Sequence, residues 1–535
     1  MLILFIITIL PCTSTKHNIL HIISDDLRPE LGAYGLTNRH TPNLDQIAAT
    51  GTTFLRTYAQ QAVCGPSRNS FLSGRRPDRS RSWNFINHFR QDHPNDWTSL
   101  PGIFNNDPDF ISIGAGKAYH PKLPPAYDGN KSWSSIALQN GGYKNPCWNT
   151  ADNPNNTFQD GGLPCFFCKI DLLSRIFPKL YNTTVANEFC TVDAYEDELS
   201  VLNAIQQLKQ VVAQKNKYFY LVVGMHKPHL PWQASVEDFN QHPLSQIKPA
   251  KYQYPPKNVP AVALQYTEHE IHESPYDPIQ NQSAILARRA YRATITGMDR
   301  KLRPLLDELK RLNVYNNTAI VFHSDHGWHL GEQGEWRKFT NFEIATKVPL
   351  IVSVPWITNQ ISRTNELSEL IDVYPTIVEL SGVINPIPDI DTIDGISLVP
   401  MLTNETASVK KYALSQYPRR VRKNRKEWDG NSIIHHARCN FTHMGYTIRT
   451  KEWRYTEWTK WNGTLLLPIW NKVWNDVVNE LYDHRNEIMY PINFDSQEEN
   501  INVVNDFVDV ARNMSKLVRN VFPSKKKIIH GTQCP

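Results

Sequence analysis

The sequence predicts an α/β protein in which a sheet is flanked by helices, followed by a smaller α+β subdomain at the C-terminal end. Through the first three-quarters of the chain, short apolar runs that suit buried strands alternate with apolar residues at helical spacing. A chain of 535 residues, 40% of them hydrophobic and 20% charged, can bury one large core and a smaller one. After about residue 410 the composition shifts toward Trp, Tyr and Asn with short β-like runs, and this shift marks the subdomain.

Four apolar segments are predicted to be buried strands, and three stretches are predicted to be helices. The strands cover 18–23, 218–223, 318–323 and 350–354. One helix is expected to begin at Thr41-Pro42, with Thr41 as the N-cap and Pro42 at the first helical position. Two further helices carry apolar stripes that are expected to face the core, namely Leu199, Leu202, Ile205, Leu208 and Val212, and then Ile295, Met298, Leu302, Leu305, Leu309 and Leu312. Pro304 interrupts the last stripe and is expected to kink that helix.

Ionisable residues follow three of the predicted strands. In chain order they are Asp25-Asp26, then His226 with His229, and then Asp325-His326. In open α/β sheets, ligands bind outside the carboxyl ends of the strands, so these side chains are expected to converge on one site. This expectation depends only on where the polar residues fall in the pattern.

The most informative segment is the run 64–68, Cys-Gly-Pro-Ser-Arg, which matches C-x-P-S-R. The segment 71–77, Phe-Leu-Ser-Gly-Arg-Arg-Pro, then follows like the second half of the same signature. On these residues the chain resembles the type I sulfatase family, and the flanking residues 60–63 and 74–78 are most similar to its iduronate-2-sulfatase branch. Further similar blocks follow in order at 24–29, 114–121, 224–229, 324–338 and 412–418. The resemblance implies the alkaline-phosphatase-like fold, with a large mixed sheet flanked by helices.

The resemblance also implies that the Cys64 thiol is not itself the catalytic nucleophile. A formylglycine-generating enzyme would oxidise it to Cα-formylglycine, and one hydroxyl of the aldehyde hydrate would attack sulfur. The second hydroxyl would then allow sulfate to be eliminated, which a plain serine or cysteine could not do. Arg68, one helical turn after Cys64, would hold the alkoxide of the hydrate. The other side chains implied to contact formylglycine, sulfate or the leaving oxygen are Lys117, His120, His229 and Lys338.

One Ca²⁺ ion is implied by the same resemblance, with ligands from Asp25, Asp26, Asp325, His326 and the modified Cys64. Carboxylate oxygens suit such a hard cation, although the histidine fits less well. Adjacent strand residues point to opposite faces, so Asp25 and Asp26 can reach one ion only if the strand ends there. A dication bound to the sulfate would remove the repulsion between its oxygens and an anionic nucleophile. Taken alone, an Asp-Asp pair at a strand end is more often a helix cap.

The implied substrate is the 2-O-sulfate of a non-reducing-end L-iduronate in heparan or dermatan sulfate. The uronate carboxylate requires a further cation, for which Arg28 and basic residues of the C-terminal subdomain are candidates. Two alternatives stay open: a sulfatase of different sugar specificity, and a secreted non-catalytic protein that binds sulfated glycans on the same fold. A metal-dependent phosphatase is disfavoured because it would carry Ser or Thr at position 64. Gly65 departs from the residue more often found after this cysteine in the family.

The chain is expected to enter the secretory pathway and to reach the lysosome or the cell exterior. Residues 1–10 are apolar but too few to span a bilayer, so 1–15 is predicted to be a signal peptide, and no other segment is predicted to cross a membrane. The net charge of +5 suits an anionic substrate and is too diffuse to indicate nucleic acid. Nine N-x-S/T sequons support the secretory route, at Asn130, Asn155, Asn182, Asn281, Asn316, Asn404, Asn440, Asn462 and Asn513.

We therefore divide the chain into the signal peptide at 1–15, a catalytic domain at 16–410 and the C-terminal subdomain at 411–535. In the subdomain, strands are predicted at 444–449 and 453–456, and a final helix at 506–518. Beside Cys12 and Cys64 there are six cysteines, which permit three disulfides in an oxidising compartment. The pair Cys439–Cys534 is a hypothesis, and so is Cys147–Cys190, for which the resemblance to the iduronate-2-sulfatase branch is the reason.

Overall fold

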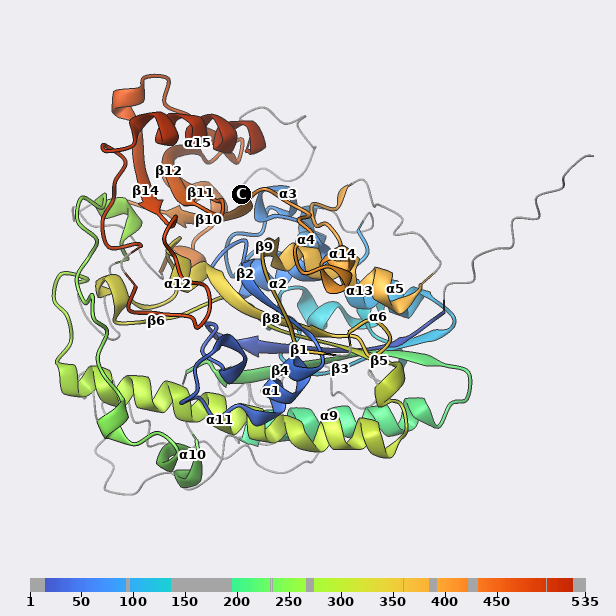
Figure 1. The fold of residues 1–535 in the computed structure, drawn as a ribbon. Helices are drawn as coiled ribbons and strands as arrows, with labels where there is room; N and C mark the ends of the chain where they lie inside the picture. Colours follow the sequence, from blue (N-terminus) through green and yellow to red (C-terminus); the bar gives the residue numbers. More distant parts are fainter. Residues whose placement is uncertain are drawn as a thin grey trace, which may run out of the picture.

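A mixed sheet of seven strands forms the centre of the fold (Figure 1). The computed structural model describes residues 15–92, 97–135, 195–230, 232, 234–265, 274–358, 360–383, 392–421, 432–496 and 498–522. In spatial order the strands are β3 (Phe110–Gly116), β4 (Tyr218–Pro228), β1 (Asn18–Asp25), β5 (Thr318–Ser324), β8 (Lys347–Ser353), β2 (Thr52–Tyr58) and β9 (Ser362–Glu369). β8 runs antiparallel to its neighbours and the other strands are parallel to one another. The predicted fold class is confirmed.

Helices cover both faces of this sheet, as Figure 1 shows. On one face lie α1 (Pro42–Ala49), α9 (Tyr195–Val212), α10 (Val236–Asn240) and α11 (Asn281–Arg311). On the other face lie α2 (Cys64–Ser73), α5 (Leu100–Asn106), α13 (Val373–Ser381) and α14 (Val399–Thr403). The strands between them are almost wholly buried, which explains why they are continuous apolar runs rather than alternating ones. None of the described helices is both long and apolar enough to cross a bilayer.

The predicted helices exist, but three details differ. In α9, Leu202 is exposed and Leu199 is half-buried, because the buried face is formed by Val201, Ala204, Leu208 and Val211. Of the predicted stripe, Leu208 is buried and Ile205 and Val212 pack against the core, whereas the placement of Leu202 in the core was wrong. Pro42 begins α1 as predicted, but the Thr41 side chain accepts no capping bond from the helix, and its hydroxyl donates instead to Asp45 at 3.2 Å. α11 runs without a break through Pro304, and its predicted stripe is buried except for the partly buried Leu312.

A separate antiparallel sheet follows the central one in the chain and lies above it in Figure 1. Its strands are β10 (Ala413–Arg419), β11 (His443–Arg449), β12 (Trp453–Asn462), β13 (Leu467–Ile469) and β14 (Val478–Asp483), with α15 (Val508–Val521) against β11 and β12. The sheet and helix bury a second core of their own. These elements agree with the predicted α+β segment, whereas the boundary at 410/411 stays a prediction.

Several predictions concern residues outside the described ranges. They include the signal peptide except Thr15, the sequons at Asn155 and Asn182, and the pair Cys147–Cys190. Cys439 is disulfide-bonded, while Cys534, its predicted partner, lies outside the described residues. Of the sequon asparagines that are described, Asn462 is half-buried and the others are exposed.

Candidate active site

The predicted site residues meet at one edge of the central sheet, where the parallel strands end. β1 ends at Asp25, β4 leads to His229, and β5 leads to Asp325. The register places Ser24 beside Ser324 and Asp25 beside Pro228, so the three strand ends are level. The chain after β2 enters α2 at Cys64, and the chain after β3 carries Lys117 and His120 to the same edge. Convergence at the strand ends, predicted from pattern alone, is confirmed.

Asp26 lies at the turn that lets two adjacent aspartates face one site. β1 ends at Asp25, and Asp26 has φ 65°, in the left-handed region that few residues other than glycine adopt. The backbone N–H of Asp26 donates to Asp325 Oδ1 at 3.0 Å, which fixes this turn. The geometry meets the condition that the sequence imposed on the pair, and left-handed residues of this kind cluster at functional sites. The alternative assignment of Asp25-Asp26 as a helix cap is wrong, since no described helix begins there.

Cys64 is the first residue of α2. Its side chain is buried, with Sγ 3.2 Å from Asp25 Oδ1, 3.3 Å from His326 Nε2 and 3.0 Å from Lys338 Nζ. Burial and the negative charge of Asp25 raise the pKa of the Cys64 thiol well above its usual range. An unmodified thiol here would therefore stay protonated and be a poor nucleophile.

Three cations surround the carboxylates. Arg68 donates Nε to Asp325 Oδ2 at 3.0 Å and lies 3.4 Å from Asp25 Oδ1. Lys117 forms an ion pair with Asp25, and Lys338 Nζ lies 2.5 Å from Asp26 Oδ1. All three cations are buried, so their attraction for an anion is little screened by water. Burial opposes ionisation of Asp25, but these cations and His229 outweigh it and hold the pKa of Asp25 well below its usual range.

The donor set fits a metal ion. Ligand atoms of Asp25, Cys64, Asp325 and His326 all lie within 4.8 Å of one another, and Asp26 forms an overlapping group with Cys64 and His229. Two oxygens on opposite sides of a calcium ion are about 4.8 Å apart, because each Ca–O distance is about 2.4 Å. Asp26 Oδ2 is buried and makes no hydrogen bond. Burial raises the pKa of Asp26 to about 6 and that of Asp325 to about 7, and a cation between them would favour the ionised forms.

His326 gives the most specific sign of a cation. Its Nδ1 lies 3.0 Å from the carbonyl oxygen of Gly327, which can only accept, so Nδ1 carries the proton. Nε2 therefore presents a lone pair, yet it faces Asp26 Oδ1 at 3.3 Å and Asp325 Oδ2 at 3.6 Å. Burial also lowers the pKa of His326 well below its usual range, so the imidazole itself does not take up a second proton that would relieve this contact. Metal-bound histidines show this arrangement, with the second ring nitrogen donating to a backbone carbonyl.

Two predicted histidines lie where the site opens. His229 is partly exposed, with Nε2 3.8 Å from Asp26 Oδ2, and burial lowers its pKa well below the usual range. His120 is half-buried, and burial followed by the charge of Lys117 lowers its pKa likewise. His226 contacts His229 ring to ring at 4.8 Å and lies 3.6 Å from Glu196, which agrees with a supporting role for it.

Comparison with known proteins identifies this arrangement. The family model described as Sulfatase matches residues 17–383. The chain belongs to the sulfatase family. It is 31% identical to iduronate 2-sulfatase of Mus musculus, over 82% of this chain and 84% of that protein, and 31% identical to iduronate 2-sulfatase of Homo sapiens, over 84% and 86%. The chain is thus a type I sulfatase and a sulfuric ester hydrolase, as the motif around Cys64 predicted.

Solved structures support the fold of this sulfatase. A phosphonate monoester hydrolase from Silicibacter pomeroyi has a TM-score of 0.65 at 20% identity and covers 96% of this chain and 97% of its own. A protein solved in complex with its substrate D-glucosamine-2-N,6-O-disulfate has a TM-score of 0.60 at 18% identity, and covers 96% of this chain and all of its own. At these identities the likeness concerns the fold alone.

Arg28 is not available for the uronate carboxylate in this sulfatase, so that suggestion is corrected. The side chain is fully buried, with Nε 2.6 Å from Glu30 and one terminal nitrogen 2.9 Å from Glu332. Phe494 covers the guanidinium at 4.0 Å. No local pattern indicates this pairing, because Glu332 is 304 residues away along the chain.

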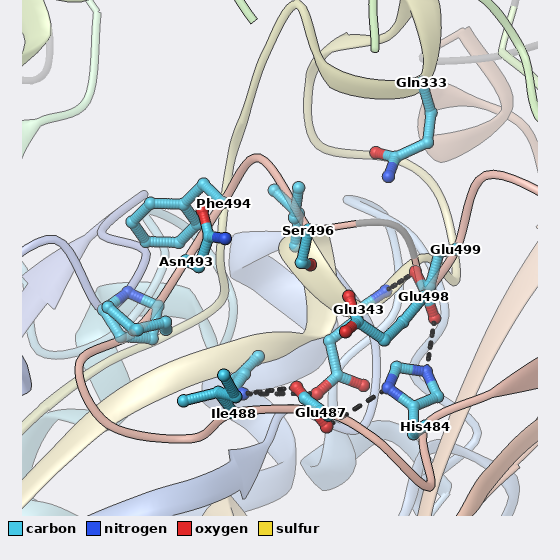
Figure 2. Close-up of a pocket in the computed structure, with 14 residues that line it drawn as sticks. Gln333, Glu343, His484, Glu487, Ile488, Asn493, Phe494, Ser496, Glu498 and Glu499 are labelled. Atoms are coloured by element: carbon cyan, nitrogen blue, oxygen red, sulfur yellow. Dashed lines mark hydrogen bonds and ion pairs between the residues drawn. The ribbon is translucent and has the colours of Figure 1, made fainter. Parts of the chain in front are cut away.

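A cavity of about 50 Å³ is lined by residues outside this site. Figure 2 shows side chains that line it. It lies between α12 (Glu343–Thr346) and the segment 484–499, which approach each other through carboxylates and a histidine. Atoms of Glu343, His484 and Glu499 lie within 4.8 Å of one another, as metal ligands would. Arginines already occupy these carboxylates, however, since Arg449 bonds Glu343 at 2.7 Å and Arg454 pairs with Glu499. We therefore assign this cluster a structural role.

That cluster ties the C-terminal sheet to the active site. Glu343 begins α12, and its backbone N–H donates to Glu499 at 2.7 Å. The same helix accepts backbone hydrogen bonds from Gly327 at 2.8 Å and Trp328 at 3.1 Å, directly after His326. Ion pairs from β11 and β12 thus hold the short helix that supports the segment directly after His326. Sequence reasoning missed this connection because no spacing in the chain brings these residues together.

Proposed function

We propose that this sulfatase hydrolyses the 2-O-sulfate of non-reducing-end L-iduronate in heparan or dermatan sulfate. The observation that carries the sulfatase chemistry is the position of Cys64 Sγ, which lies within 3.3 Å of Asp25, His326 and Lys338 at the start of a helix. The similarity to two iduronate 2-sulfatases over most of the chain supports the sugar assignment.

Cys64 is proposed to be converted to Cα-formylglycine by the formylglycine-generating enzyme as the chain enters the secretory pathway. The modified residue would supply a hydrated aldehyde, whose hydroxyl is a better nucleophile here than the buried thiol. In the structure, Sγ marks the place from which the oxygens of that residue would project. The free backbone N–H groups at the start of α2 add positive potential around this point.

A single Ca²⁺ is proposed to be held by Asp25, Asp26, Asp325 and His326 together with residue 64. When bound, it would act as a Lewis acid that withdraws charge from a sulfate oxygen and from the nucleophile. Carboxylates supply most of the ligands, which favours a hard cation of this kind over a softer transition metal.

The remaining charged side chains are proposed to bind and orient the sulfate. Lys117 pairs with Asp25 and Lys338 pairs with Asp26, and both lysines would contact sulfate oxygens. Arg68, which lies 3.4 Å from Asp25, would stabilise the developing negative charge on residue 64. His229 has its Nε2 3.8 Å from Asp26 Oδ2 and is proposed to meet the leaving sugar oxygen or a sulfate oxygen. His120 is proposed to contact residue 64 and the sulfate.

A panel of sulfated disaccharides tests the substrate assignment. Purified protein from a secretory host should release sulfate from 2-O-sulfated iduronate and should act far more slowly on sulfated hexosamine. Preference for the hexosamine would favour a sulfatase of different sugar specificity. Tight binding of sulfated glycans without release of sulfate would favour the non-catalytic binding protein. We further propose a lysosomal or secreted location, which detection of the protein in culture medium or in lysosomal fractions would test.

A further inference from the structure

Gly65 leaves space for an aromatic ring beside the nucleophile. A Cβ atom added at Gly65 would lie 2.8 Å from Cδ1 and 3.1 Å from Cε1 of Phe85, and 3.4 Å from the carbonyl oxygen of Asn84. Real Cβ atoms do not approach other heavy atoms at 2.8 Å, so an alanine at this position would have to push the ring away. The glycine at position 65, which departs from the family pattern, therefore leaves the space that the Phe85 ring occupies.

Phe85 in turn lies against His120. The two rings are stacked, with centroids 4.2 Å apart and planes inclined by 21°. On another side, the ring of the exposed His435 meets Phe85 edge-on at 5.7 Å. Phe85 thus connects the residue next to Cys64 with a histidine of the sulfate pocket.

The C-terminal part of the chain holds Phe85 in place. Its backbone N–H donates to the carbonyl oxygen of Ile434 at 2.8 Å, within the short helix η9 (Ser432–His435). The neighbouring Asn84 donates its side-chain amide to the carbonyl oxygen of His436 at 2.9 Å and accepts the N–H of Asn87 at 2.8 Å. The ring is therefore placed by fixed backbone on both sides and is not a mobile surface group.

One ring nitrogen of His120 makes a hydrogen bond to the backbone. Nδ1 lies 3.0 Å from the carbonyl oxygen of Pro121, so this nitrogen carries the proton that is donated. The backbone around it is closed by a hydrogen bond from the N–H of Leu123 to the carbonyl oxygen of His120 at 3.0 Å. The stacked Phe85 ring limits the tilt of the imidazole plane.

We propose that Gly65 and Phe85 form a matched pair that sets the orientation of the His120 imidazole beside residue 64. Phe85 is a positioning residue in this arrangement, and it acts through His120 rather than by touching the sulfate. The proposal rests on the proposed function of the site. It also assigns the C-terminal segment 432–436 a part in catalysis, because that segment places Phe85.

Kinetics of paired variants test the proposal in the full-length protein, with kcat expressed per mole of formylglycine measured by peptide mass analysis. Phe85→Leu keeps an apolar side chain but removes the flat ring, and should lower kcat about 10-fold to 100-fold while changing KM little. Phe85→Tyr keeps the ring and should retain most of the activity. Gly65→Ala should lower kcat when Phe85 is present, and should lower it little further when it is added to Phe85→Leu. Phe85→Leu should likewise have no effect on kcat when it is added to His120→Ala.

Equal loss of activity in Phe85→Tyr and Phe85→Leu, or an undiminished effect of Phe85→Leu in His120→Ala, would overturn the proposal. A crystal structure of Gly65→Ala gives a readout that needs no activity: the Phe85 ring should move and the His120 imidazole should turn with it. A shifted Phe85 beside an unmoved His120 would refute the pairing. A wild-type protein that carries formylglycine but hydrolyses no sulfate ester would refute the proposed function instead, and the crystal structure would still decide this inference.

Discussion

His326 Nε2 lies 3.3 Å from Asp26 Oδ1, and both atoms are hydrogen-bond acceptors. Such a contact inside a protein is unfavourable unless a positive charge lies between the two atoms. His326 Nε2 also lies 3.6 Å from Asp325 Oδ2, so three side chains that directly follow β1 and β5 place acceptor atoms against one another. Lys338 Nζ lies 2.5 Å from Asp26 Oδ1, and a dication held by the same group of residues would satisfy the acceptor atoms of all three side chains.

Removal of the metal should destabilise the protein. Chelation of the dication, followed by thermal unfolding, should lower the midpoint by several degrees, since a ligand at 100 times its Kd contributes about 2.7 kcal/mol. Addition of Ca²⁺ should restore both the midpoint and the activity. Asp26→Asn should remove most of this calcium-dependent shift, because it deletes one charged ligand. A midpoint that is the same with chelator and with Ca²⁺ would rule out the metal site.

Replacement of Cys64 should abolish catalysis and spare the fold. Cys64→Ala removes the group that would become formylglycine, and turnover should fall to background while the unfolding midpoint changes by a few degrees at most, since only one sulfur atom is lost. Cys64→Ser is the matched control, because it supplies a hydroxyl but not the second one that the mechanism needs. Substantial turnover by either variant in a sulfate-release assay would refute the assignment of residue 64 as nucleophile.

The buried ion pairs of the C-terminal sheet should matter more than exposed ones. Arg454→Met leaves the buried Glu499 without its arginine and should cost about 3 to 5 kcal/mol of unfolding free energy. Arg303→Met is the matched control on α11, where Arg303 and Asp307 form an exposed pair, and it should cost less than about 0.5 kcal/mol. Denaturant unfolding of both variants measures the difference. Equal costs would show that the network does not hold α12 in place.

Acid should weaken a second buried link, between Glu369 and Arg76. Burial opposes the charge on Glu369, but Arg76 at 2.5 Å and Lys410 at 2.7 Å outweigh it and lower the pKa of Glu369 to about 2. Because this pKa is below that of the unfolded chain, the ionised pair stabilises the fold above about pH 4.5, and the contribution of about 3 kcal/mol is lost as the pH falls toward 2.

Glu369→Gln should therefore lower the free energy of unfolding at pH 6. As the pH falls, the variant should lose less of that free energy than the wild-type protein does. Unfolding free energies measured between pH 2.5 and pH 6 for both proteins test this expectation. If the wild-type protein and Glu369→Gln lose stability in parallel as the pH falls, the ion pair has no such role.

The sequence predicted the site better than it predicted some of the helices. Asp25, Asp325 and His229 could be placed together because each follows a buried strand, and strand ends in such sheets meet at one edge. Leu202 was wrongly placed in the core because several apolar residues of α9 are close to helical spacing, and only packing against β3 and β4 decides which of them are buried. Thr41 could not be excluded as a capping side chain, because its contact with Asp45 depends on the folded turn.

Contacts between residues far apart in the chain could not be predicted from the sequence. Glu332 neutralises Arg28, and Glu499 meets Arg454 and Glu343, through contacts that no local pattern encodes. The departure at Gly65 was visible in the sequence, but its explanation required Phe85, whose ring lies against Gly65 and whose backbone N–H is bonded to Ile434, 349 residues further along the chain.

Peptide mass analysis of residue 64, on protein made in a secretory host, tests the central claim most directly. The account predicts that the peptide containing Cys64-Gly65-Pro66-Ser67-Arg68 carries an aldehyde in place of the thiol, and that sulfate release scales with the aldehyde fraction. An intact thiol in every molecule, or sulfate release that does not depend on the aldehyde, would contradict it.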